Sequence, residues 1–303
     1  MHQAQVTEWG QAPKYIEVVD LPSPAADEVR IRVLAAGTHQ VVRSRASGTH
    51  YTSGQLPHVP GIDGTGTTDD GKLVYFSSFD TGSFSEYVNM DKRRALPVPD
   101  GLDPVQVAGI TNPAMSSWMA LKARTNDLPK DFTVLIVGAT SASGRVAIPL
   151  ARGLGAKRVI GAARNKAALD TLGLDETVII ANEPEKTDFS TLGDVDVILD
   201  YVYGPVTIHL FNSLKSHRPV QYVEIGGLDS TEMMLPSSIL RSKNITIRGS
   251  GPGAWSMQEV VETMPDMLTA LKDVPEQPVK TVKLADVEKK WNNAGSERLV
   301  FVP

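Results

Sequence analysis

The stretch from Phe132 to Asn165, FTVLIVGATSASGRVAIPLARGLGAKRVIGAARN, constrains the fold more than any other part of the chain. Residues 132–137 form a continuous β-branched and apolar run, which is typical of a parallel strand buried on both faces. From Gly144 to Leu154 the apolar residues recur at helical spacing, and residues 157–163 predict a second strand. Strand, glycine-bounded turn, helix and strand together predict half of a doubly wound α/β unit.

The turn between the predicted strand and helix is a candidate cradle for a diphosphate. Its spacing is Gly138-x-x-Ser141-x-x-Gly144, with Ser141 at a position where glycine is common. Small residues allow the backbone to approach phosphate, and a helix N-terminus presents N–H groups and the positive end of its dipole. An ordinary βαβ turn without a ligand is the alternative. The cofactor-binding residues predicted in this turn are Gly138, Ala139, Thr140, Ser141, Ala142, Ser143 and Gly144.

The end of the second predicted strand indicates which dinucleotide would bind. An NAD site usually has an acidic residue there, whereas this chain has Arg164-Asn165-Lys166. Arg164 offers a planar fork to a 2′-phosphate, Lys166 a second charge, and Asn165 either a helix cap or a ribose contact. The alternative is that both cations are simply solvated. If a dinucleotide binds, the sequence favours NADP(H) over NAD.

Composition excludes several classes of protein. The net charge of -5 gives no electrostatic footprint for nucleic acid or an anionic membrane. The first residues lack a signal-peptide pattern, and no apolar run approaches the roughly 20 residues that span a bilayer. We therefore expect a cytoplasmic protein with neither partner. The absence of cysteine rules out disulfides, thiolate metal sites and a cysteine nucleophile.

The order of the other predicted elements suggests two domains. Residues 1–100 predict short strands at 15–19, 29–36, 72–76 and 83–88, as in a barrel-like domain. A helix over 104–121 should break at Asn112-Pro113. Later helices are predicted at 165–172, 206–214, 257–271 and 285–293, and later strands at 178–180, 195–202, 220–225, 245–249, 279–284 and 298–302. The tail is expected to return to the first domain, giving domains 1–113 with 272–303 and 114–271.

Six segments together resemble the medium-chain dehydrogenase/reductase superfamily, within it the zinc-independent quinone oxidoreductase branch. They are residues 29–37 (VRIRVLAAG), 56–66 (LPHVPGIDGTG), 82–87 (GSFSEY), the helix at 112–121, the cofactor turn and 284–288 (LADVE). The resemblance covers nearly the whole chain. It implies an α/β protein with a GroES-like β-barrel-type catalytic domain plus a doubly wound Rossmann cofactor domain, and a homodimer paired through the edge strand 245–249.

The resemblance also implies a site without metal. Zinc-dependent members take ligands from a cysteine and a Gly-His-Glu triplet, where this chain has His39 and Gly61-Ile62-Asp63. Ile62 cannot bind zinc, and although His39, His50, His58 and Asp63 could in principle assemble a site, they lack tight ligand spacing. Without a metal to lower the pKa of a hydroxyl, reduction of a quinone or conjugated alkene is easier than oxidation of an alcohol.

Candidate catalytic residues come from the loop between His39 and Tyr51. The resemblance places an Asn near the nicotinamide where this chain has His39, and a Tyr near the substrate where it has His50. Tyr51 or His50 is expected to hydrogen-bond or protonate the substrate, and His39 to contact the nicotinamide amide or ribose. Ordinary loop chemistry is the alternative. Further cofactor-binding residues implied are Asn112, Ser116, Tyr201, Tyr203, Ile225, Gly226, Gly227, Ser250 and Gly251.

Other enzyme classes lack their motifs here. No Tyr-x-x-x-Lys, Gly-Lys-Ser/Thr or Gly-x-Ser-x-Gly occurs, which argues against a short-chain reductase, a P-loop enzyme and an α/β-hydrolase. We predict a zinc-independent, NADPH-dependent oxidoreductase that transfers hydride to a small-molecule quinone or α,β-unsaturated carbonyl. The alternatives are an NADPH-binding sensor without turnover and a carbonyl or alcohol oxidoreductase of the same superfamily.

Overall fold

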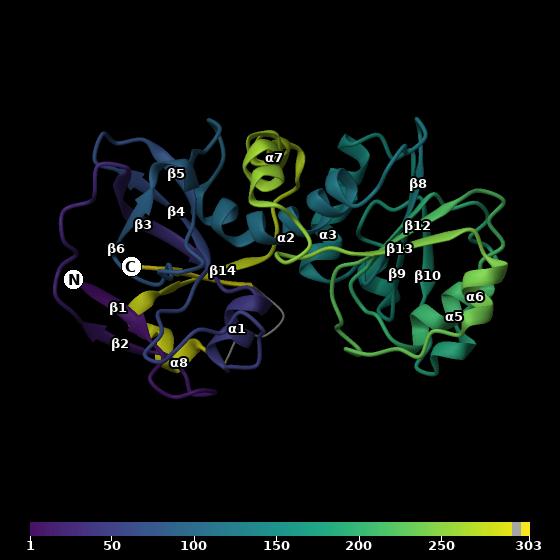
Figure 1. The fold of residues 1–303 in the computed structure, drawn as a ribbon, viewed down its shortest axis with the longest axis horizontal. Helices are drawn as coiled ribbons and strands as arrows, with labels where there is room; N and C mark the ends of the chain where they lie inside the picture. The colour runs from purple at the N-terminus through teal and green to yellow at the C-terminus, as the bar shows by residue number, and fades with distance from the viewer. Residues whose placement is uncertain (293–297) are drawn as a thin grey trace. The chain divides into compact units, whose positions relative to one another are not determined.

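The computed structural model describes residues 1–292 and 298–303 (Figure 1). The chain divides into two compact units: unit 1 comprises Met1–Asn112 and Pro275–Pro303, and unit 2 comprises Pro113–Val274. Helix α2 (Pro104–Ala123) runs from the first unit into the second. No helix in the described part of the chain is both long and apolar enough to cross a membrane.

Unit 2 is built on a parallel sheet of six strands. The strand order is β10-β9-β8-β11-β12-β13, and every neighbouring pair is parallel. The strands are β8 (Thr133–Val137), β9 (Arg158–Ala163), β10 (Glu176–Ile179), β11 (Val197–Asp200), β12 (Val220–Glu224) and β13 (Ile245–Gly249). Because the chain enters at β8, extends to one side and then crosses to the other, the predicted doubly wound sheet is confirmed, with its switch point beside β8.

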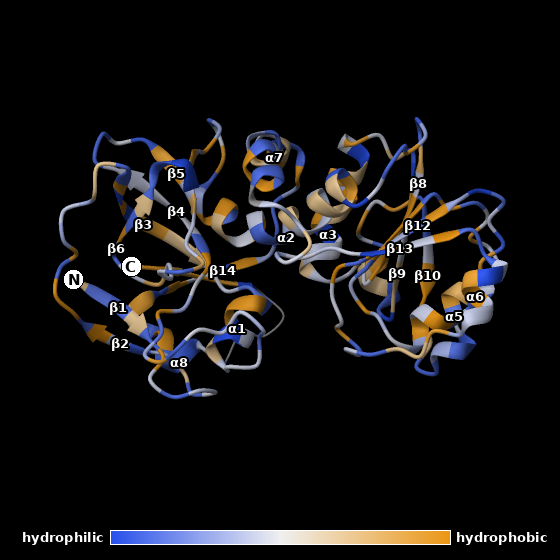
Figure 2. Cartoon of the chain, in the orientation of Figure 1, coloured by the Kyte–Doolittle hydropathy of each residue, from blue (hydrophilic) through white to orange (hydrophobic). Residues whose placement is uncertain are grey.

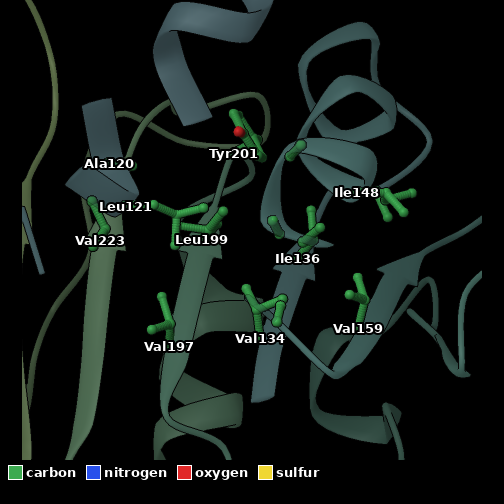
Figure 3. Packing of buried hydrophobic residues seen from close by; sticks show 14 of the residues in the cluster. Ala120, Leu121, Val134, Ile136, Ile148, Val159, Val197, Leu199, Tyr201 and Val223 are labelled. Carbon is green, nitrogen blue, oxygen red and sulfur yellow. The ribbon is translucent and has the colours of Figure 1, made fainter. Parts of the chain in front are cut away.

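The core of unit 2 explains why these residues form a sheet. All five residues of β8 are buried, as expected of a strand covered on both faces. Val134 and Ile136 pack with Val197, Leu199 and neighbouring side chains in one apolar layer (Figure 3). Hydrophobic residues are correspondingly concentrated in the strands of this sheet (Figure 2). The helices of the unit beyond α2 are α3 (Ala142–Gly153), α4 (Lys166–Leu169), α5 (Pro205–Ser213), α6 (Ser237–Ser242) and α7 (Met257–Ala270).

Unit 1 is rich in antiparallel strands. Its larger sheet has the order β14-β15-β3-β4-β5-β7, with β6 also paired to β3, and β1 pairs with β2 separately. The elements are β1 (His2–Gln5), β2 (Lys14–Glu17), β3 (Glu28–Gly37), α1 (Gln40–Ala46), β4 (Asp63–Thr68), β5 (Leu73–Ser77), β6 (Tyr87–Asp91), β7 (Ala95–Pro97), β14 (Val279–Lys283), α8 (Val287–Lys290) and β15 (Arg298–Val302). The C-terminal strand β15 lies between β14 and β3, so the tail is part of this sheet.

Several predicted elements are wrong in detail. The break expected at Asn112-Pro113 does not occur, because Pro113 is accommodated inside the continuous helix α2. The strand expected at 83–88 lies at Tyr87–Asp91. The segment after His39, expected as a loop, begins with helix α1, and the strand β4 was not predicted. The helix expected at 285–293 is reduced to a 3₁₀ turn and α8, and position 293 lies outside the described residues.

Candidate functional site

The turn after β8 depends on two glycines. Gly138 has φ of 89°, a left-handed conformation that glycine adopts without steric cost. A Cβ on Gly144 would lie 2.3 Å from the Gly138 carbonyl oxygen and 2.7 Å from the Ala139 Cα. The start of α3 can therefore lie directly against the turn only because residue 144 has no side chain.

The first turn of α3 presents backbone donors. Ser141 is the N-cap, and its Oγ accepts a hydrogen bond from the Gly144 N–H at 3.0 Å. No hydrogen bond among the described residues uses the N–H groups of Ala142 and Ser143. These two donors and the positive end of the helix dipole favour an anion at this position.

A cavity of about 310 Å³ opens at this turn. Its walls come from residues at or just after the carboxyl ends of β8 to β12, where ligands of doubly wound sheets bind. The lining residues are Gly138, Thr140, Ser141, Ala163, Arg164, Asn165, Ile180, Ala181, Asn182, Pro184, Val202, Val206, Leu228 and Asp229. The structure thus brings together five of the residues predicted from the sequence to bind a cofactor, two of which follow β9.

The three polar residues after β9 have different environments. Asn165 caps α4, with its Oδ1 accepting from the Ala168 N–H at 3.0 Å. The Lys166 ammonium pairs with Asp170 at 2.7 Å and does not line the cavity. Arg164 is exposed, lines the cavity and makes no hydrogen bond or ion pair with the described residues. Arg164 is therefore the cation of this group that is available to a phosphate.

Sequence reasoning missed a large part of the cavity wall. Ile180, Ala181 and Asn182 follow β10, and Val202 follows β11. The sequence did offer one signal, which is that strands following each other in a doubly wound unit often become neighbours. The carboxyl ends of neighbouring parallel strands meet at one edge of the sheet, so the residues after β10 lie beside those after β9.

The other predicted cofactor residues lie outside this cavity wall. Ala139, Ala142, Ser143 and Gly144 form the adjoining turn and helix start. Tyr201 is buried in the apolar core, where burial raises its pKa to about 12 (Figure 3). The Ser250 hydroxyl accepts from the indole of Trp255 at 3.0 Å, and the Ser116 hydroxyl donates to the Pro113 carbonyl at 2.7 Å. The remaining residues are Asn112 in α2, Tyr203 after β11, Ile225, Gly226 and Gly227 after β12, and Gly251 after β13. Their cofactor contacts stay a prediction.

His39 in unit 1 is held in a buried polar network. It is 1% exposed, and its Nε2 lies 2.9 Å from Asp63 Oδ1, while its Nδ1 lies 2.5 Å from Arg298 Nη1. Because guanidinium only donates, Nδ1 is the acceptor and the His39 proton sits on Nε2, donating to Asp63. The other Asp63 oxygen accepts from the Tyr75 hydroxyl at 2.9 Å.

The charges in this network are set by burial. Burial lowers the pKa of His39, and the adjacent Arg298 charge lowers it further against the opposing effect of Asp63. Burial also lowers the pKa of Arg298 to about 10, so it stays cationic at neutral pH. Both His39 nitrogens are engaged, and a direct role for His39 at a nicotinamide would require one of these bonds to break.

His50 and Tyr51 lie in a different environment. Their rings stack at 4.3 Å, and Tyr51 is 74% exposed. The Nδ1 of His50 accepts from the Thr52 N–H at 3.1 Å, which leaves its proton on Nε2. Burial lowers the pKa of His50, which favours this neutral form. The pair therefore offers an imidazole N–H and a phenol O–H as donors.

The described residues contain no group of three His, Cys, Asp or Glu side chains arranged to hold a metal ion. Ile62, at the position of the histidine in the Gly-His-Glu triplet, is fully buried in the apolar core of unit 1 and supplies no ligand. His39 and Asp63 are instead satisfied by each other, by Arg298 and by Tyr75.

The chain is similar in sequence to proteins named as quinone reductases or quinone oxidoreductases. The chain is 33% identical, over a gapped alignment of 355 positions, to a probable NADPH-dependent quinone reductase of Emericella nidulans, and the alignment covers 100% of both proteins. It is 28% identical over 176 residues to the quinone oxidoreductase of Homo sapiens, covering 54% of this chain and 53% of the human one. No protein-family model matches.

Solved structures share the fold. The quinone oxidoreductase of Thermus thermophilus, solved also with NADPH, superposes with a TM-score of 0.80 at 22% identity over 100% of both chains. The Pseudomonas syringae quinone oxidoreductase gives 0.81 at 18% identity, covering 100% of this chain and 99% of that one.

Proposed function

The chain belongs to the medium-chain dehydrogenase/reductase superfamily, and from this membership we propose that it is a zinc-independent, NADPH-dependent oxidoreductase. Its hydride acceptor is a quinone or an α,β-unsaturated carbonyl compound. The observation that carries the proposal is the cavity of unit 2 at the carboxyl ends of the strands. Arg164, which has no partner among the described residues, lines it, and the adjoining start of α3 has two backbone N–H groups that no described residue accepts from.

The residues of this cavity and of the adjoining start of α3 fit NADPH. The N–H groups of Ala142 and Ser143 would bind its pyrophosphate, and Arg164 would pair with its 2′-phosphate. The side chain of Asn165 serves as a helix cap, so the ribose is left to other residues of the wall. When bound, NADPH supplies the hydride, and the protein contributes binding and orientation.

Unit 1 is proposed as the substrate domain. Reduction of a conjugated carbonyl places negative charge on an oxygen, which neutral hydrogen-bond donors stabilise without a metal. The Nε2–H of His50 and the hydroxyl of Tyr51 are the donors we assign to this task. His39 acts instead through the network it forms with Asp63 and Arg298, which fixes the start of α1.

The reaction can be tested with purified protein, NADPH and a panel of quinones, enals and enones. The proposal predicts sustained NADPH consumption that depends on the acceptor. Saturable NADPH binding with no consumption by any member of the panel would favour the sensor instead.

Replacing Arg164 with alanine is expected to lower the preference for NADPH over NADH. The lost charge-assisted contacts to the 2′-phosphate correspond to a change of about 10- to 100-fold in the ratio of the two dissociation constants. The matched variant is Lys166→Ala, which should change the ratio much less because Asp170 already pairs with this ammonium. Unchanged selectivity in Arg164→Ala would remove the argument for a 2′-phosphate site.

The active form is proposed to be a homodimer paired through β13. This strand is one of the two edges of the six-stranded sheet, and exposed edges need cover. The Asn244 carbonyl and Ser250 N–H bond to β12, so by alternation the N–H of Ile247 faces outward. Light scattering should show a dimer for the wild type and a monomer for Ile247→Pro, with circular dichroism checking the fold. A monomeric wild type would refute the pairing.

A cytoplasmic location is the further proposal. The chain has no cysteine, so its fold does not depend on an oxidising compartment. Fractionation of cells that express the full protein should recover it with cytoplasmic markers, and recovery in another compartment would contradict this.

A further inference from the structure

Unit 1 contains an arginine whose guanidinium has no hydrogen-bond acceptor among the described residues. Arg45 lies in the last turn of α1 and is 7% exposed, and its Nε and Nη1 are buried without a partner in the described part of the chain. Its guanidinium carbon lies 5.3 Å from the centroid of the Phe79 ring, which provides a cation–π contact but no acceptor. A buried cation with unused donors is costly unless an anion pairs with it.

Among the described side chains of unit 1, none forms an ion pair with Arg45. Burial lowers its pKa, and Asp80 is the acid that opposes this. The Asp80 carboxylate is 76% exposed and pairs with Arg94 at 3.1 Å. Arg43, on the same helix, differs because its guanidinium donates to the Trp291 backbone carbonyl at 2.5 Å. Its guanidinium carbon also lies 5.0 Å from the centroid of the Trp291 ring.

Two histidines lie within reach of the Arg45 charge. The pKa values of His50 and His58 are lowered first by burial and then by Arg45, so both are neutral at pH 7. The Nε2 of His58 is also buried without a partner among the described residues. Ser53 donates to the Arg45 carbonyl at 3.3 Å and so ties the segment of His50 and Tyr51 to the end of α1.

We propose that Arg45, assisted by His58, binds an acidic group of the substrate. This inference rests on the proposed reductase function and narrows its substrate class to quinones or enones that carry a carboxylate or another anionic substituent. The acidic group pairs with Arg45 while the carbonyl oxygen is bound by the neighbouring donors of His50 and Tyr51. Guanidinium groups recognise such anions through paired N–H donors.

The test compares a naphthoquinone that bears a propanoate side chain with its methyl ester. The acid should bind the wild type at least about tenfold more tightly than the ester, measured by calorimetry without NADPH. Arg45→Met should bring the two affinities to within about twofold of each other. Arg43→Met, the matched loss of a cation on α1, should leave the ratio unchanged. Equal binding of acid and ester by the wild type would mean that the Arg45 guanidinium hydrogen-bonds to water and not to the ligand's acidic group, and would overturn the proposal.

Two further measurements separate loss of the anion site from misfolding and from loss of the reductase activity. Asp80→Asn removes an exposed competing acid and should raise the ratio of acid to ester affinity even if Arg45→Met fails to fold; an unchanged or lower ratio counts against the site. NADPH oxidation by the methyl ester tests the reductase function separately. Ester turnover without acid preference refutes the anion site alone, whereas acid preference without turnover refutes the reductase alone.

Discussion

Adding one methyl group at Gly144 is expected to lower kcat/KM for NADPH about 100-fold, since displacement of a binding group by about 1 Å has effects of this size. In Gly144→Ala the new Cβ would lie 2.3 Å from the Gly138 carbonyl oxygen, which is backbone and cannot rotate away. The start of α3 must therefore move off the turn, taking the Ala142 and Ser143 N–H groups with it. Steady-state kinetics with varied NADPH and a fixed quinone measure the effect.

The control for this variant lies on the same helix. A Cβ on Gly153 meets no heavy atom within 4 Å, and alanine has the higher helix propensity. Gly153→Ala should therefore retain wild-type NADPH kinetics. Wild-type kinetics in Gly144→Ala itself would show that close approach of the helix to the turn does not matter for cofactor binding.

Removing the Asp63 carboxylate is expected to lower the free energy of unfolding by about 3–5 kcal/mol, because two buried donors lose their acceptor and a buried cation loses the opposite charge near it. Asp63→Ala leaves the His39 N–H and the Tyr75 hydroxyl without their shared acceptor, and it leaves the largely buried Arg298 cation without the nearby opposite charge. Denaturant unfolding monitored by circular dichroism measures the change.

Two comparisons separate burial from charge. Asp70→Ala breaks an exposed ion pair with Lys72 and should hardly move the unfolding midpoint. The double variant Asp63→Ala/Arg298→Leu should recover part of the lost stability, because the uncompensated cation is gone. A midpoint for Asp63→Ala close to that of the wild type would show that the network contributes little to folding.

The proposed cofactor half of the site could be read from the sequence because its signals are local. The apolar run of β8, the spacing from Gly138 to Gly144 and the cation at Arg164 all lie within one βαβ unit. The turn, α3 and the position of Arg164 on the cavity wall all follow from the order of strand, turn, helix and strand in this unit. The residues after β10 and β11 were missed because their place depends on which strands become neighbours.

The proposed substrate half was harder to predict because its determinants are long-range. The partners of His39 come from β4 and β15, and Arg298 is separated from His39 by 259 residues. The helix α1 has seven residues and no side-chain cap, so its pattern is too short to predict. In β4, DGTGTT lacks the alternation of apolar and polar residues that identifies a strand. Pro113 removes only one backbone bond from the 20-residue helix α2, and the helix continues through it.

Calorimetric titration of the purified protein with NADPH and with NADH tests the central claim most directly. If the N–H groups at the start of α3 bind the pyrophosphate and Arg164 the 2′-phosphate, NADPH will bind saturably at one per chain and at least about tenfold more tightly than NADH. Absence of saturable binding by either dinucleotide, or tighter binding of NADH, would contradict the account.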